Sequence, residues 1–190
     1  MITIGDRVRE AIDYMSKGQI EYALTPACIA LDLTAKKITG RTKSLKSDYK
    51  KFVSDFTWLI SYMGLPGLVA KSIEVPFEHP DIEKNNDGFC RIEDIIYHAI
   101  RCELVHSTGP DTKIKWSDRI AIESDGPGSL TLSNKFPWGI IGAIVFCPAN
   151  HNENIEETYW ISMDGFKFFI QEVWGREDLA LRVLKMNLNG

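Results

Sequence analysis

The sequence lacks the short motifs that mark several well-known classes of enzyme. It contains no Gly-rich phosphate loop, no Gly-x-Ser-x-Gly nucleophile turn and no His-Glu-x-x-His zinc helix. Its four cysteines include no Cys-x-x-Cys pair, the spacing typical of zinc ribbons and thioredoxin-like redox sites. Any functional interpretation must therefore rest on less specific patterns.

A long apolar run is also absent. The longest nearly uncharged stretch extends from Trp138 to Ala149, well short of the roughly 20 residues that span a bilayer. The first ten residues do not contain the apolar core of a secretory signal. Cys28 and Cys147 stand in apolar runs, where a free thiol packs as a small hydrophobic group. We therefore expect a cytoplasmic protein in a reducing compartment, without membrane association.

The size and composition are those of one globular domain. The chain has 190 residues, of which 44% are apolar and 25% charged. No internal repeat, low-complexity tract or Pro/Ser-rich linker suggests a boundary. The sequence thus predicts a single domain over residues 1–190, long enough to bury a core without disulfides or a structural metal.

Positive charge is concentrated in one short segment of an acidic chain. Residues 36–51 carry seven cations against Asp48 alone, a net charge of +6, whereas the whole chain carries −4. The seven cations are Lys36, Lys37, Arg41, Lys43, Lys46, Lys50 and Lys51. A local patch of this kind can attract phosphates because screening confines charge effects to about 10 Å. Lys43, Lys46 and Lys50 are tentative RNA-binding residues; the alternative is an ordinary solvated surface.

Hydrophobic periodicity predicts mostly helices. Apolar residues recur at three- and four-residue intervals from Leu45 to Met63, which indicates one amphipathic helix. Pro26 predicts a kink or a restart in an earlier helix, and the proline-rich residues 64–89 are expected to be loop. The other predicted helices span residues 6–17, 19–38, 91–106 and 138–148, with two helical pieces over 163–186 that break near Gly175.

One β-excursion is expected late in the chain. Residues 114–123 and 129–134 show partial alternation of apolar and polar side chains, and the turn-rich sequence Asp125-Gly-Pro-Gly128 separates them. This arrangement predicts a β-hairpin inserted at about residues 114–134. The predicted fold class is therefore mainly α, a helical bundle that carries one small β-hairpin.

The helix over residues 91–106 carries the most informative polar residues. On an ideal helix Asp94, His98 and Arg101 lie opposite the apolar stripe, whereas Glu103 lies within it. A carboxylate there requires a partner such as a cation or His106. Arg101 and His106 are about 140° apart on one helix. They meet only if the helix loosens at its end or a second copy of the chain completes the site.

The segment from Ile95 to Gly109 resembles the signature of the HEPN superfamily, an Arg followed after four to six residues by a His near a helix end. That superfamily consists of small helical bundles, many of them metal-independent endoribonucleases in host defence and toxin–antitoxin systems. The resemblance implies that Arg101 and His106 form the active pair in a homodimer, with RNA as substrate and a cognate antitoxin as a possible partner. It implies no metal and no cofactor.

The residue types suit RNA cleavage through the ribose 2′-OH. A histidine exchanges protons near neutral pH, and a guanidinium matches two phosphate oxygens. Glu103 stands three residues before His106 and could orient its ring. DNA lacks the attacking hydroxyl and should resist cleavage. The predicted catalytic residues are thus Arg101, His106 and Glu103.

Other interpretations remain open. Arg101 could pair with a carboxylate on another helix, and His106 could cap the helix C-terminus. Cys102 stands where active HEPN proteins often have a polar residue, which favours a non-catalytic module for dimerisation, nucleotide binding or protein interaction. A zinc site from Cys90, His98, Cys102 and His106 is disfavoured because His98 points away from the others on the helical wheel. The tryptophans are interpreted as core or interface anchors.

Overall fold

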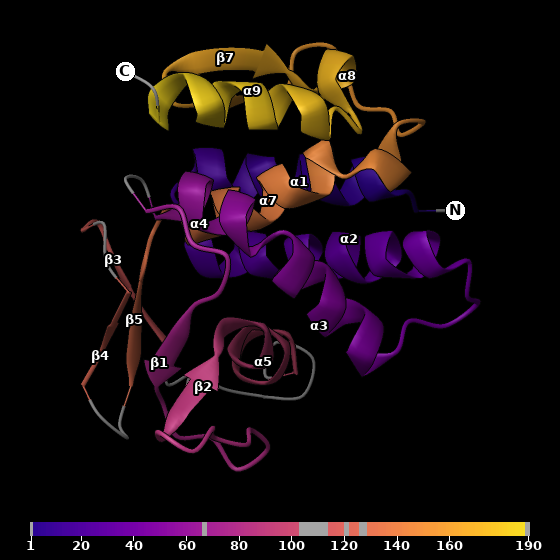
Figure 1. Cartoon of the computed structure of the whole chain (residues 1–190). Coiled ribbons are helices and arrows are strands. Elements are labelled where there is room, and N and C mark those ends of the chain that lie inside the picture. The colour runs from indigo at the N-terminus through magenta and orange to yellow at the C-terminus, as the bar shows by residue number, and fades with distance from the viewer. Residues whose placement is uncertain (1, 66–67, 103–113, 120–121, 126–128, 189–190) are drawn as a thin grey trace.

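The structure is a computed structural model that describes residues 2–65, 68–102, 114–119, 122–125 and 129–188 (Figure 1). The helices are α1 (Ile4–Ser16), α2 (Ile20–Thr39), α3 (Lys46–Asp55), α4 (Thr57–Gly64), α5 (Ile92–Ile95), the π-helix η1 (Ile96–Cys102), α7 (Phe136–Phe146), the 3₁₀ turn η2 (Pro148–Asn150), α8 (Ile170–Val173) and α9 (Glu177–Leu188). The strands are β1 (Glu74–Pro76), β2 (Phe89–Arg91), β3 (Ile114–Ser117), β4 (Ile122–Ser124), β5 (Leu130–Ser133), β6 (Trp160–Met163) and β7 (Phe166–Phe169). No helix in the described ranges is both long enough and apolar enough to cross a membrane.

The fold mixes helices and strands, so the prediction of a mainly α bundle of HEPN type is wrong. Helices account for 54% and strands for 15% of the structure, and the strands form three small sheets. Each strand has only three or four residues. Alternation over so few positions is hard to distinguish from part of a helical pattern, which is why most of these strands were not predicted.

The elements form three layers around α7 (Figure 1). α7 lies in the middle layer with α1, α2 and α4, and ten of its eleven residues are buried. The β6–β7 hairpin, α8 and α9 cover one side of this layer. On the other side lie α3, α5 and the two remaining sheets. The predicted helix over 138–148 is therefore confirmed, and it is the central element of the fold.

The late β-excursion is a three-stranded sheet rather than a hairpin. β4 and β5 are antiparallel, with Ile122 opposite Leu132, as the turn-rich spacer predicts. The segment expected as one strand divides in two, however, and β3 pairs parallel to the opposite edge of β5, with Ile114 beside Leu130. Because the predicted strand is divided into β3 and β4, which pair with opposite edges of β5, the strand order is β3-β5-β4.

Two helix predictions, over residues 45–63 and over the first C-terminal piece, require correction. The helix expected over 45–63 breaks at Phe56, which separates α3 from α4. α2, by contrast, continues through Pro26 without a restart. The first C-terminal helical piece is instead the β6–β7 hairpin followed by one turn of helix, because Asp164 and Gly165 both adopt positive φ in a tight turn. An Asp-Gly pair is a strong hairpin signal that the helical periodicity obscured.

The contact between α4 and α7 depends on a glycine. A Cβ atom at Gly139 would lie 2.2 Å from the carbonyl oxygen of Ile60. We expect Gly139→Ala to lower the free energy of unfolding by about 1–3 kcal/mol, because a backbone atom cannot yield as a side chain can. Urea denaturation measures the change. Ser47→Ala at an exposed position of α3 should change stability by less than about 0.5 kcal/mol; equal stability of the Gly139 variant and the unmodified protein would contradict the close contact.

Candidate functional site

Only part of the predicted catalytic group can be placed. Arg101 lies in η1 and is described, whereas Glu103 and His106 lie outside the described residues. The predicted RNA-binding residues Lys43, Lys46 and Lys50 are all described. Arg101 and the side chains that contact it form the first candidate site.

Arg101 extends from a π-helix rather than an α-helix. α5 continues directly into the seven-residue η1, and π-turns are rare and often occur at functional sites. His98, expected on the open side, is only 8% exposed. Its ring centroid lies 6.0 Å from that of His79, in the loop after β1. Asp94 of α5 pairs with Lys50 of α3, and Arg101 of η1 pairs with Asp32 of α2, so the side of the helix opposite its apolar stripe also contacts neighbouring helices.

The guanidinium of Arg101 is held by a carboxylate and an aromatic ring. Its Nη2 donates to Oδ2 of Asp32 on α2 over 2.9 Å. Its Cζ lies 5.4 Å from the ring centroid of Tyr97, within cation–π range. Both charged side chains are about one quarter exposed, 27% for Arg101 and 25% for Asp32. The pairing expected as the alternative to a catalytic role is therefore present, although the guanidinium still reaches solvent.

A second cation approaches the same tyrosine. Nζ of Lys46, at the start of α3, lies 5.8 Å from the Tyr97 ring centroid. Lys50, one turn further along α3, is instead engaged in an ion pair with Asp94, and Lys43 is exposed in the loop before α3. Tyr97 also packs edge-on against the buried Tyr49, with ring centroids 5.3 Å apart. We call Arg101, Lys46, Tyr97 and Asp32 the Arg101 cluster.

Ion pairs neutralise much of the positive segment around this cluster. Besides Lys50, three of its cations are paired within the described residues: Lys37 with Glu153, Arg41 with Asp48 and Lys51 with Asp55. The net charge of +6 thus overstates the field that a ligand would meet.

The groups beneath the cluster are neutral at physiological pH. Burial raises the pKa of the Cys28 thiol to about 11 and holds the pKa of Tyr49 well above its usual value. A thiol with so high a pKa is a poor nucleophile. The chemistry available at this surface therefore depends on the cations and on Tyr97, not on the buried thiol.

No grouping of three or more His, Cys, Asp or Glu side chains suited to a metal ion occurs among the described residues. The zinc alternative considered above includes His106 and so extends beyond that part of the chain. Cys90, another member of that set, donates its thiol to the carbonyl of Phe77 over 3.0 Å. In this position Cys90 acts as a buried structural residue.

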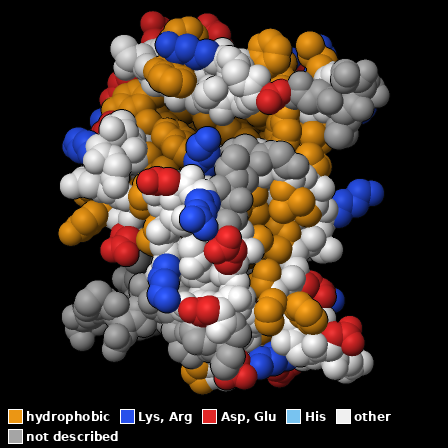
Figure 2. Space-filling model, turned by 90° about the vertical axis from the view of Figure 1, so that its left-hand side faces the viewer, with side chains coloured by type: hydrophobic (Ala, Val, Ile, Leu, Met, Phe, Trp, Pro, Cys, Tyr) orange, Lys and Arg blue, Asp and Glu red, His pale blue; other side chains and the backbone are white. Residues whose placement is uncertain are grey.

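A second candidate site lies at the opposite end of α2 from Lys36 and Lys37. It is a pocket of about 720 Å³ between the C-terminal end of α1, the end of α4, the start of α7 and the β6–β7 hairpin. Its aromatic walls include Tyr62, Trp138, Tyr159 and Trp160. Hydrophobic side chains gather beneath the uppermost layer on this face of the molecule (Figure 2). Volume and lining are typical of sites for small molecules.

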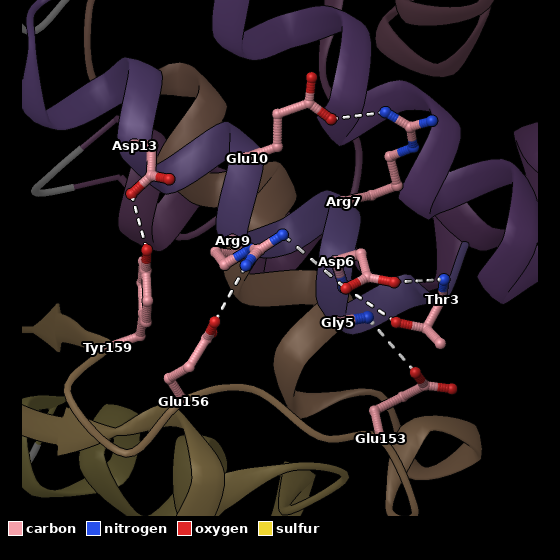
Figure 3. A network of polar contacts seen from close by, with 10 residues as sticks. All are labelled: Thr3, Gly5, Asp6, Arg7, Arg9, Glu10, Asp13, Glu153, Glu156 and Tyr159. Carbon is pink, nitrogen blue, oxygen red and sulfur yellow. Dashed lines mark hydrogen bonds and ion pairs between the residues drawn. The ribbon is translucent and has the colours of Figure 1, made fainter. Parts of the chain in front are cut away.

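One wall of the pocket is fixed by polar contacts between distant parts of the chain (Figure 3). The Tyr159 hydroxyl donates to Oδ1 of Asp13 on α1 over 2.9 Å. Arg9 pairs with Glu156 at 2.9 Å, and the N–H of Gly5 donates to Glu153 over 3.3 Å. Burial, and then the hydrogen bond to Asp13, raise the pKa of Tyr159, so the phenol remains a donor at neutral pH. These contacts hold the segment before β6 against α1.

Sequence reasoning missed this pocket. Its lining residues come from four separate stretches, 12–16, 62–63, 135–138 and 158–165, and no short motif joins them. The only residues of the pocket that the sequence analysis had singled out were Trp138 and Trp160, which were interpreted as core or interface anchors. Trp138 does pack partly against the core, but Trp160 is 46% exposed.

The chain matches the profile of the Rv1289 family over residues 3–189. It belongs to the Rv1289 family. Two similar members are the uncharacterized protein Rv1289 of Mycobacterium tuberculosis and the uncharacterized protein Mb1320 of Mycobacterium bovis. Each is 23% identical to this chain over 184 residues, which cover 93% of this chain and 85% of the relative. No solved structure matches the chain significantly.

The names of these two relatives state no activity.

The Asp32–Arg101 pair should contribute measurably to stability. In a double-mutant cycle of Asp32→Asn and Arg101→Gln, we expect a coupling free energy of about 1 kcal/mol, near the upper end for surface ion pairs, because both groups are partly desolvated. Thermal or urea unfolding of the four proteins gives the value. The exposed pair Lys51–Asp55, with side chains 75% and 52% accessible, is the control and should give less than about 0.5 kcal/mol. Equal coupling in both cycles would contradict this account of the cluster.

The burial of His98 predicts a pH dependence of stability. Burial and then the charge of Lys46 lower its pKa, with His79 acting in the same direction and Asp81 and Asp94 opposing. As the pH falls below the unfolded value of about 6.5, the unfolded chain binds a proton that the folded chain resists, so stability decreases, by at most about 1.4 kcal/mol per pH unit.

Substitution of His98 isolates this contribution. We expect His98→Phe to flatten the decline in melting temperature between about pH 7.5 and about pH 5.5, whereas His151→Phe at an exposed position should leave it unchanged. An unaltered decline in the His98 variant would show that other groups cause it.

Proposed function

We propose that this protein binds single-stranded RNA at the Arg101 cluster and cleaves it without a metal ion, through attack of the ribose 2′-OH. The observation that carries the proposal is the approach of two cations, Arg101 and Lys46, to one partly exposed tyrosine ring. Cationic groups beside an accessible aromatic ring suit a phosphate and an unstacked base.

Arg101 retains binding capacity despite its ion pair. A guanidinium has five N–H donors, and the hydrogen bond to Asp32 occupies Nη2. The carboxylate fixes the orientation of the side chain, and a guanidinium that is about one quarter exposed can still present further N–H donors to phosphate oxygens. Lys46 and the exposed Lys43 would add attraction along the strand.

The proton transfers in this proposal belong to His106, oriented by Glu103. Both assignments derive from the resemblance of residues 95–109 to the HEPN signature. The same resemblance supports the further proposals of a homodimer that joins two such sites, a role in defence or toxin–antitoxin systems with a cognate antitoxin, and a cytoplasmic location.

A second candidate function is a non-catalytic binding module. The Asp32–Arg101 ion pair favours it, because a paired arginine contributes to stability without any substrate. The neutralisation of most of the basic segment points in the same direction.

Cleavage of labelled single-stranded RNA in the presence of EDTA tests the first proposal. We expect 2′,3′-cyclic phosphate ends from the unmodified protein. The rate should fall at least about 100-fold in His106→Ala, which removes the proposed acid–base group, and about 100-fold in Arg101→Gln. Arg182→Gln, on the exposed face of α9, is the matched control and should cleave normally.

Different failures distinguish the two functions. RNA cleavage that persists in His106→Ala would refute the mechanism. RNA that binds in an Arg101-dependent manner without being cut would support the non-catalytic module.

A further inference from the structure

The pocket beside β6 has a positive end that lacks an ionic partner among the described residues. Lys135 lines the pocket and is exposed, and nothing in the described part of the chain forms an ion pair with its ammonium group. Lys135 is also the N-cap residue of α7, and no side chain caps that helix. The N-terminus of an eleven-residue helix adds partial positive charge at the same place. An anionic group would pair with the Lys135 ammonium, and the partial charge of the helix would favour it.

The acidic residues of the pocket are already engaged. Oδ1 of Asp13 accepts the Tyr159 hydroxyl, and Asp164, in the turn after β6, also interacts within the protein. Their charges nevertheless disfavour ligands with several negative groups. Their remaining lone pairs can accept hydrogen bonds from N–H groups.

The middle of the pocket is aromatic and apolar. Trp138 lines it from α7, and Met63 and Ile161 contribute apolar surface. Trp160 lines it from β6, where Nζ of Lys167 lies 4.6 Å from its ring centroid. Trp138 is the one residue of α7 that is not buried. Such walls favour a flat ring by stacking and by burial of apolar area.

We propose that this pocket binds a small heteroaromatic anion, its ring against Trp138 and its single acid group at Lys135. The site goes beyond the proposed RNA activity, because it shares no residue with the Arg101 cluster. The acid could be a phosphate, as in a nucleoside monophosphate, or a carboxylate, as in an indole acid.

Quenching of tryptophan fluorescence in the full-length protein tests the proposal with matched probes. Adenosine 5′-monophosphate is compared with adenosine, and indole-3-acetate with tryptamine, with calorimetry as a second readout where the probe itself absorbs. We expect at least one of the two acids to bind with a dissociation constant below about 1 mM and at least about tenfold more tightly than its matched partner. Which acid binds identifies phosphate or carboxylate as the preferred group.

Two charge-matched variants locate the acid group. Lys135→Gln should weaken binding of the preferred acid about tenfold, the effect of losing one charge-assisted contact. Lys36→Gln removes the same charge near the far end of α2 and should leave binding unchanged. Trp138→Phe, which keeps an aromatic wall, should preserve binding, whereas Trp138→Ala should abolish it in a protein with an unaltered circular dichroism spectrum.

Three results would overturn the proposal: tighter binding of tryptamine or adenosine than of the acids, equal loss of affinity in the Lys36 and Lys135 variants, or no binding of any probe. None of them bears on RNA cleavage, which is tested with Arg101 and His106 variants.

Discussion

The fold depends on the burial of α7 on all sides. A helix that is apolar around its whole circumference cannot lie on a surface, and α7 contains no charged residue between Phe136 and Phe146. It therefore requires a layer on each side, and Gly139 allows α4 to approach its backbone closely. The α1–α2 pair and the C-terminal elements complete the enclosure. The two candidate sites form at the outer margins of this arrangement.

Sequence patterns predicted the long elements well and the short ones poorly. α1, α2 and α7 follow from periodicity and from an apolar run because their patterns extend over ten or more residues. The break at Phe56 was not predicted, since Phe52, Phe56 and Leu59 maintain one helical stripe across it and all three are buried. The parallel pairing of β3 with β5 depends on contacts between separate segments, which local alternation cannot encode.

The candidate sites show the same difference. Arg101 stood out because it lies on a periodic helix close to a recognisable signature, but its partner Asp32 is 69 positions away on another helix. The helical wheel placed His98 towards solvent, because a wheel at 100° per residue describes neither a π-helix nor the elements that pack on its other side. The pocket beside β6 could not be predicted from the sequence for a related reason. Its walls come from segments far apart in the chain, and only their packing brings them together.

The hydrogen bonds of Figure 3 also determine when the pocket can exist. They join residues 5–13 to residues 153–159, which are separated by more than 140 positions. On the ribosome the N-terminal wall emerges first and must wait for the segment that completes the opposite wall. A chain interrupted between the end of α7 and about residue 158 would contain α1, α4 and α7 but would lack the wall that residues 158–165 supply. Any ligand of this site would therefore distinguish a completed polypeptide from an unfinished one, and by mass action would stabilise only the former.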